Sequence, residues 1–112
     1  MFDNETEGKI NEAVVLELAK ACKDYGATYH SLHEGYAVLL EEVEEAEKEL
    51  DYIKNHMAMM WDAVKVDDVN EVKSNARCVA LDAVNLAKEA TQIAAVARKI
   101  IGEGVKDVEG II

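Results

Sequence analysis

Six glutamates lie close together in the stretch LLEEVEEAEKEL, residues 39–50: Glu41, Glu42, Glu44, Glu45, Glu47 and Glu49. Residues three and four apart share one face of an α-helix, so Glu41, Glu42 and Glu45 form an arc beside the apolar face, with Glu42 nearest to it. Like charges four residues apart repel each other, and Lys48 alone does not neutralise them. Mg²⁺ or Mn²⁺ would bind such carboxylates; the alternative is an acidic face that is only solvated.

A second group of oxygen-bearing side chains lies on one edge of a later, otherwise apolar segment: Asp82, Asn85, Glu89 and Gln92. Buried polar groups without partners cost several kcal/mol, on the order of 2–7. These side chains therefore need partners, water or a cation. A hydrogen-bond network between helices and a metal-ligand site both satisfy this requirement.

Three helices are predicted from the spacing of apolar residues, over residues 4–25, 32–65 and 69–101. The two long helices begin at capping motifs, in which Ser31 precedes Glu34 and Asp68 precedes Glu71 by three residues. The middle helix carries an apolar seam in steps of three and four along its whole length.

The two long helices need partners. A helix of about 30 residues is on the order of 45 Å long, more than a monomer of this size covers. The third helix is apolar in nearly every direction, which is typical of a buried helix. We therefore expect an all-α chain whose two long antiparallel helices assemble into a homo-oligomeric four-helix-type bundle, as a homodimer or homotetramer.

The 112 residues include no proline and show no shift in composition, which predicts a single domain over residues 1–112 with a flexible tail at 103–112. The net charge of −11 argues against nucleic acid or an anionic membrane as the partner. Without a recognisable targeting segment or membrane span, we expect a cytoplasmic protein. Cys22 and Cys78 stand in apolar surroundings, which favours reduced core thiols.

The two polar groups together resemble a known family. Glu41-Glu42-Val43-Glu44-Glu45 matches the motif E-E-x-x-E, and Glu89-Ala90-Thr91-Gln92 stands where a following E-x-x-D is expected. This pairing resembles the MazG-like all-α nucleoside triphosphate pyrophosphohydrolases. The chain departs from their pattern in having Gln92 in place of aspartate and a longer interval between the two halves.

The resemblance implies that Mg²⁺ or Mn²⁺ is held by Glu42, Glu45, Glu89 and Gln92, with Asp82 on the same face as a further ligand. It implies Glu41 and Glu45 as catalytic carboxylates, and hydrolysis of a nucleoside triphosphate to the monophosphate and pyrophosphate. The alternative is a nucleotide-binding protein of this fold that has lost catalysis, because Gln92 brings no charge to the metal site. The competing function is a non-enzymatic helical oligomer that serves as an interaction or assembly module.

Other residues carry weaker signals. His30 and His33 could touch a nucleotide, although capping or surface roles are commoner for such histidines. Trp61 could stack on a base, although packing in the seam is commoner for a tryptophan at this spacing. Lysine 99 is a possible phosphate contact that no spacing argument selects over Lys54 or Arg77.

Overall fold

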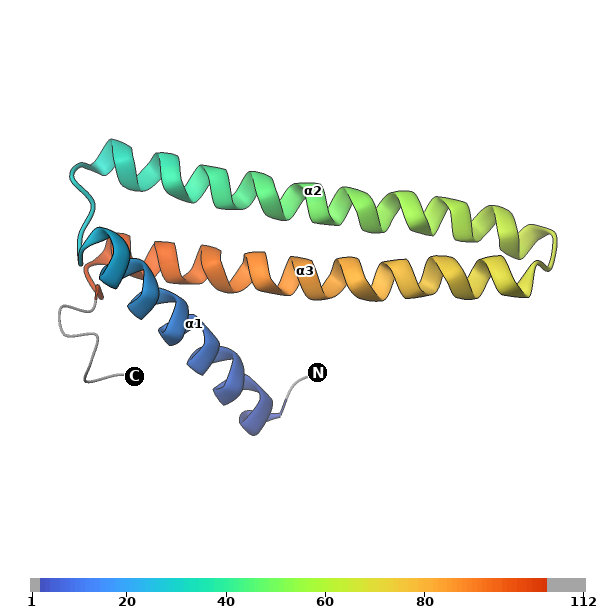
Figure 1. Ribbon diagram of the computed structural model, residues 1–112, viewed down its shortest axis with the longest axis horizontal. Coiled ribbons are helices and arrows are strands. Elements are labelled where there is room, and N and C mark those ends of the chain that lie inside the picture. The colour runs from blue at the N-terminus through green and yellow to red at the C-terminus, as the bar shows by residue number, and fades with distance from the viewer. Residues whose placement is uncertain (1–2, 105–112) are drawn as a thin grey trace. The chain divides into compact units, whose positions relative to one another are not determined.

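The protein is all-α in the computed structural model, which describes residues 3–104 (Figure 1). Its three helices are α1 (Asn4–Tyr25), α2 (Leu32–Lys65) and α3 (Val69–Ile101). The predicted helix bounds are confirmed. Long helices α2 and α3 pack together as an antiparallel pair. Within the described residues, no helix is long and apolar enough to cross a membrane.

The chain divides into two compact units. Unit 1 comprises residues 1–43 and 90–112, of which 3–43 and 90–104 are described, and unit 2 comprises residues 44–89. Helices α2 and α3 contribute to both units, whereas α1 belongs to unit 1 alone. The division concerns packing, so the single domain over residues 1–112 stays a prediction, as does assembly into an oligomer.

Unit 1 has a small apolar core built by α1 against α3. Val14, Leu18 and Cys22 of α1 are buried with Ala95 of α3, and Leu18 is only 1 % exposed. The spacing of the α1 residues in steps of four places them on one face of the helix. Burial of this face against α3 holds α1 in unit 1.

The start of α2 approaches the end of α3 closely within unit 1. Gly35 is buried, and a Cβ atom at this position would lie 3.1 Å from Cγ1 of Ile100 and 3.3 Å from Cδ2 of Tyr29. A larger residue would push these side chains away. Gly35 therefore permits the contact between the two helix ends.

Side chains cap each helix at its N-terminus. Asp3 Oδ1 accepts a hydrogen bond from the Thr6 amide at 2.8 Å, and this bond holds the pKa of Asp3 below its ordinary value. The Ser31 hydroxyl accepts from the Glu34 amide at 3.1 Å, as the capping motif predicts. The Glu34 carboxylate accepts from the His30 amide at 2.9 Å, one residue before the cap.

Unit 2 is a two-helix hairpin joined by the turn at residues 66–68 (Figure 1). Asp68 caps α3 by accepting from the Glu71 amide at 3.1 Å, as predicted. Asp67 has a φ of 54°, a left-handed conformation that glycine adopts most easily. It ends α2 in a Schellman-type turn, in which the Asp68 amide donates to the Ala63 carbonyl at 3.0 Å.

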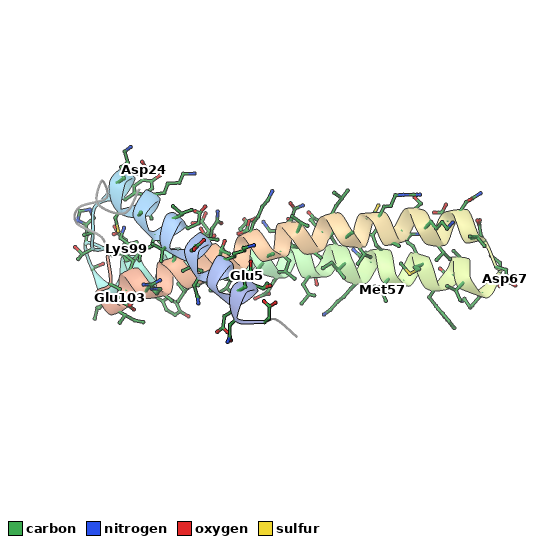
Figure 2. The ribbon with its side chains drawn as sticks, turned by 90° about the horizontal axis from the view of Figure 1, so that it is seen from below. Glu5, Asp24, Met57, Asp67, Lys99 and Glu103 are labelled. Carbon is green, nitrogen blue, oxygen red and sulfur yellow. The ribbon has the colours of Figure 1, made fainter. Side chains whose placement is uncertain are left out.

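Unit 2 has almost no core of its own. Ala63 and Asn75 are its buried residues, and Asn75 Nδ2 donates to the Glu71 carbonyl at 3.0 Å. The seam predicted along α2 is half-buried or exposed throughout, and side chains stand out from both helices of the hairpin, Met57 among them (Figure 2). Cys22 is buried, Cys78 is half-buried, and neither belongs to a disulfide.

Helix α3 ends at Gly102, whose φ is 103°. The Glu103 amide donates to the Arg98 carbonyl at 2.9 Å, and the Glu103 carboxylate lies 3.5 Å from the Arg98 guanidinium. Of the tail predicted to be flexible, residues 103–112, only Glu103 and Gly104 are among the described residues.

Candidate functional site

Two of the predicted metal ligands line one pocket of unit 1. Glu42 of α2 and Gln92 of α3 line a pocket of about 260 Å³, together with residues of α1 that include Glu17, Lys20 and Asp24. Both predicted ligands are half-buried. The prediction that Glu42 borders the apolar face of its helix agrees with its half-buried position in unit 1.

The remaining predicted site residues have other surroundings. Glu41 belongs to unit 1 and is exposed, whereas Glu45, Asp82 and Glu89 belong to unit 2. Glu45 Oε1 accepts a hydrogen bond from Lys48 Nζ at 3.3 Å. Glu89 is half-buried and makes a polar interaction. The convergence of all these ligands on one cation stays a prediction.

Asp82 has a partner that sequence reasoning missed. Its Oδ2 atom lies 2.9 Å from Nδ1 of His56, across the two helices of unit 2. Both side chains are partly buried, which strengthens a hydrogen bond to a carboxylate. His56 and Asp82 are 26 positions apart, so only the antiparallel register of the hairpin reveals the pair.

Within residues 3–104, no group of three or more histidine, cysteine, aspartate or glutamate side chains is placed to hold a metal ion. A preformed cage is not a general requirement for Mg²⁺. This cation usually keeps several waters and is bound by one or two carboxylates together with the phosphates of a substrate. Glu42 and Gln92 offer oxygen atoms of the kind that fits this mode of binding.

A larger pocket of about 440 Å³ lies beside the first in unit 1, and the two share Ala21, Tyr25, Glu42 and Val96. Its other lining residues are Tyr29, His30, Glu34, Val38 and Lys99. Lysine 99 is only 3 % exposed, and its Nζ atom lies 4.2 Å from the centre of the Tyr29 ring. Figure 2 marks Lys99 near the end of α3.

Burial is the main reason that the pKa of Tyr29 is raised above its ordinary value. The electrostatic effect of Cys22, Glu34 and Glu42 adds to the same shift. A phenolate is disfavoured both by loss of water and by nearby negative charge. The Tyr29 hydroxyl is therefore held in its neutral form, in which it both donates and accepts hydrogen bonds.

Sequence reasoning did not identify this second pocket. Tyr25 and Tyr29 flank Gly26, where α1 ends, and were not singled out as binding residues. Lysine 99 follows the buried Ala95 and Val96 by four and three residues, so it lies on the same stripe of α3. A charged residue on a buried stripe is the signal that would have selected Lys99 over the other basic residues.

Comparison of the chain with protein-family models, with curated proteins and with solved structures gives no match. The resemblance to the MazG-like proteins therefore rests on the two short motifs alone.

Proposed function

We propose that the protein binds a nucleoside triphosphate together with Mg²⁺ or Mn²⁺ and hydrolyses it to the nucleoside monophosphate and pyrophosphate. One observation carries the proposal: Glu42 and Gln92, one from each half of the motif pair, line the same pocket of unit 1. The neighbouring pocket adds two tyrosines and a buried lysine, a lining that suits a nucleoside.

The cation, when bound, supplies positive charge that neutralises the phosphates and lowers the pKa of a water ligand. In the proposed reaction, water attacks the α-phosphorus, the bond to the α–β bridging oxygen breaks, and pyrophosphate leaves. Glu42 and Gln92 would hold the cation, and Glu41 and Glu45 would orient the water and accept its proton. Glu45 and Glu89 complete the proposed ligand set. Asp82 precedes Gln92 by ten residues, about 15 Å along α3, so as a ligand it would bind a separate cation.

Charge supports a role for a cation. The chain has a net charge of −11, and the smaller pocket carries the carboxylates of Glu17, Asp24 and Glu42 against the single ammonium of Lys20. Without neutralisation, a triphosphate would be repelled from such a surface. Gln92 adds no negative charge, so we expect weaker cation binding than an aspartate would give.

The test is pyrophosphate release from a panel of nucleoside triphosphates, with Mg²⁺, with Mn²⁺ and with neither. Glu42→Gln should lower turnover at least tenfold, whereas Glu44→Gln, on the exposed side of α2, should leave it unchanged. Gln92→Asp should raise the affinity for Mg²⁺. Turnover that is absent from the whole panel, together with a melting temperature that Mg²⁺ and nucleotide do not raise, contradicts the proposal.

A nucleotide binder without catalysis is separated by the same measurements. For such a protein, Mg²⁺ and nucleotide raise the melting temperature while no pyrophosphate is released. Gln92→Asp then becomes the decisive variant. If the missing charge is what abolished catalysis, this substitution should produce turnover.

Unit 2 favours a second candidate function, that of a non-enzymatic helical oligomer. Its helices expose apolar side chains, among them Met57, Met59, Trp61, Val64 and Leu81, and Trp61 is 60 % exposed. Exposed apolar side chains in such number are typical of an interaction surface. We propose that this surface supports a homodimer or homotetramer, whether or not the protein is an enzyme.

Sedimentation equilibrium tests the oligomer directly. We expect a mass of two or four chains, and Trp61→Glu should shift the mass towards one chain, because burying a carboxylate in an apolar interface is costly. Asp62→Lys, at an exposed neighbouring position, serves as the control. A wild-type protein that sediments as a single chain contradicts the proposed assembly.

A further inference from the structure

The two helices of unit 2 contact each other along one stripe of each helix. The stripe of α2 runs from Ala46 to Ala63 and that of α3 from Val72 to Glu89, in steps of three and four residues. Apart from Cys78, every buried or half-buried residue of the hairpin belongs to these two stripes. Steps of three and four are the spacing of a coiled-coil seam, so each helix uses one seam for its partner within the chain.

A second stripe with the same spacing runs along α2, about a quarter turn around the helix from the first. Glu47 and Lys54 are its charged members. Its large apolar side chains are between 41 % and 60 % exposed: Leu50, Met57, Trp61 and Val64. Helix α3 does not cover this second seam, so α2 lacks a second packing partner there.

The equivalent stripe of α3 consists mainly of small side chains. Its exposed alanines follow Lys73 in steps of three and four: Ala76, Ala80, Ala83 and Ala87. On both helices the second stripe lies one residue after the first, as Met57 follows His56 and Ala83 follows Asp82. An antiparallel pair is related by a two-fold axis normal to the pair, so equivalent positions lie on the same side. The two second stripes therefore share one side of the hairpin, the apolar face of unit 2.

The opposite face of unit 2 is more polar. Met59 and Leu81 are exposed there, among the polar side chains of Lys48, Asn55, Asp62, Ser74, Asn85 and Lys88. The apolar face carries two lysines, at positions 54 and 73, and one glutamate, at position 47, whereas the whole chain has a net charge of −11. Two copies that meet through the apolar face therefore avoid most of the repulsion between acidic chains.

The apolar face is large enough for a stable dimer. The helices of unit 2 are about 32 Å long, and two helices side by side are about 20 Å wide, so the face measures roughly 600 Å². Two such faces would bury about 1,200 Å² in total, which reaches the range of about 1,200–2,000 Å² for specific, stable interfaces. A second copy of the hairpin has the length and width to cover the whole face.

Large and small residues of two copies match in register. A two-fold axis along the helices places α2 of each copy against α3 of the other, at the level that the contact of His56 with Asp82 sets within the chain. Each large side chain then lies opposite a small one, so a single helix separation fits the interface. The pairs are Leu50 with the partner's Ala87, Met57 with the partner's Ala80, and Trp61 with the partner's Ala76.

The other packing of two hairpins, with α2 on α2 and α3 on α3, lacks this match. Met57 and Trp61 would then face large side chains, while the alanines of α3 would face alanines. The separation of two helices depends on the side chains at their contact, so these two contacts would require different separations. The size pattern therefore favours α2 against the partner's α3.

We propose that the apolar face of unit 2 binds a second copy of this chain, with the large side chains of α2 packed against the alanines of the partner's α3. This inference rests on the proposed oligomer and names its occupant, its face and the helices that meet. In this dimer Met59 and Leu81 stay on the uncovered side of the hairpin.

Sedimentation equilibrium over a range of chain concentrations measures the dissociation constant Kd of the dimer. Met57→Ala should raise Kd at least about tenfold, because it removes a large side chain from both symmetry-related contacts. Met59→Ala is the matched control, since Met59 is 52 % exposed and Met57 is 51 % exposed, on opposite faces. It should leave Kd within about twofold of the wild-type value.

An exchange of side-chain sizes tests which helices meet. Ala80→Leu overfills the contact and should raise Kd at least about tenfold. Adding Met57→Ala to it restores one large and one small side chain at each contact, so Kd should return to within about threefold of wild type. Circular dichroism establishes that each variant is folded. If Ala80→Leu does not fold, the comparison of Met57→Ala with Met59→Ala still decides which face is used.

Equal Kd values for wild type and Met57→Ala, or a double variant that associates more weakly than both single variants, would overturn the inference. Its failure can be distinguished from failure of the proposed oligomer. A wild-type protein that sediments as a single chain contradicts both. A wild-type dimer that Met59→Ala weakens and Met57→Ala does not retains the oligomer and loses the inference.

Discussion

The two units use the same pair of helices to different effect. In unit 1, helix α1 covers segments of α2 and α3, and the result is a buried core around Leu18 and two adjoining pockets. In unit 2, the hairpin stands without a third helix and buries only Ala63 and Asn75. Two packed helices thus make a scaffold, whereas a third helix is needed to enclose a core and a binding site.

The largest expected effect separates the two units by their cores. Leu18→Ala should lower the free energy of unfolding by about 2–5 kcal/mol, because it opens a cavity in a closed core. Leu81→Ala is the matched change in unit 2, where Leu81 is 68 % exposed, and should cost less than about 0.5 kcal/mol in a monomer. Urea unfolding followed by circular dichroism measures both.

Equal losses of unfolding free energy for Leu18→Ala and Leu81→Ala would contradict the contrast between the two units. They would mean that Leu81 is covered in solution, as assembly through its face of unit 2 requires. Dilution of the protein then becomes informative, because the cost of Leu81→Ala should depend on chain concentration only if a second copy covers it.

The next effect concerns the polar contact that joins the helices of unit 2. A double-mutant cycle with His56→Ala and Asp82→Ala should give a coupling energy of about 1–3 kcal/mol, since the hydrogen bond is partly buried and involves a carboxylate. The exposed pair Asp62 and Lys65, 3.1 Å apart, is the control and should couple by less than about 0.5 kcal/mol.

A coupling no larger than that of the control would show that the hydrogen bond contributes little to unit 2. The cycle also probes the predicted metal role of Asp82. If Asp82 binds a cation of its own, saturating Mg²⁺ should reduce its coupling to His56, because one carboxylate cannot fully serve both partners.

The two units end a helix in the same way with different residues, and this gives a smaller effect. Gly102 of unit 1 and Asp67 of unit 2 both have positive φ, at 103° and 54°. Gly102→Ala should cost about 1 kcal/mol because a Cβ atom disfavours that conformation. Asp67→Gly should stabilise unit 2 by less than about 1 kcal/mol, since aspartate tolerates this region better than most residues.

Thermal unfolding measures the loss of stability expected for Gly102→Ala and the gain expected for Asp67→Gly. Asp24→Gly, a substitution near the end of α1 at a helical position, is the control and should destabilise the protein. An Asp67→Gly variant that also loses stability would show that the entropy gained by the unfolded chain outweighs the relief of strain.

The fold was predictable because its signals are local. Ser31 and Asp68 cap the two long helices, and each cap forms the bond that its motif predicts. Between these caps and the glycines, the spacing of the apolar residues predicts α-helices. The turn conformation of Asp67 was not predictable, because aspartate has no strong preference for positive φ.

The candidate site was predictable only in part, because its geometry is tertiary. The motif placed Glu42 and Gln92 together, and both line one pocket. It did not reveal that Asp82 bonds to His56, or that Lys99 is buried beside Tyr29. Those contacts depend on the register of α2 against α3 and on where α1 packs, neither of which is a local property.

The smallest effect is a pH dependence that belongs to unit 1 alone. Burial, with the electrostatic effect of Cys22, Glu34 and Glu42, raises the pKa of Tyr29 in the folded protein. The contribution of Tyr29 is therefore fully present below its unfolded pKa of about 10 and is lost as pH rises through the folded value. Tyr29→Phe should show a constant stability difference from wild type up to about pH 10, and then a smaller alkaline loss than wild type. Tyr52→Phe, on the exposed face of unit 2, is the control, and identical alkaline behaviour of wild type and Tyr29→Phe would mean that the pocket is open to water in solution.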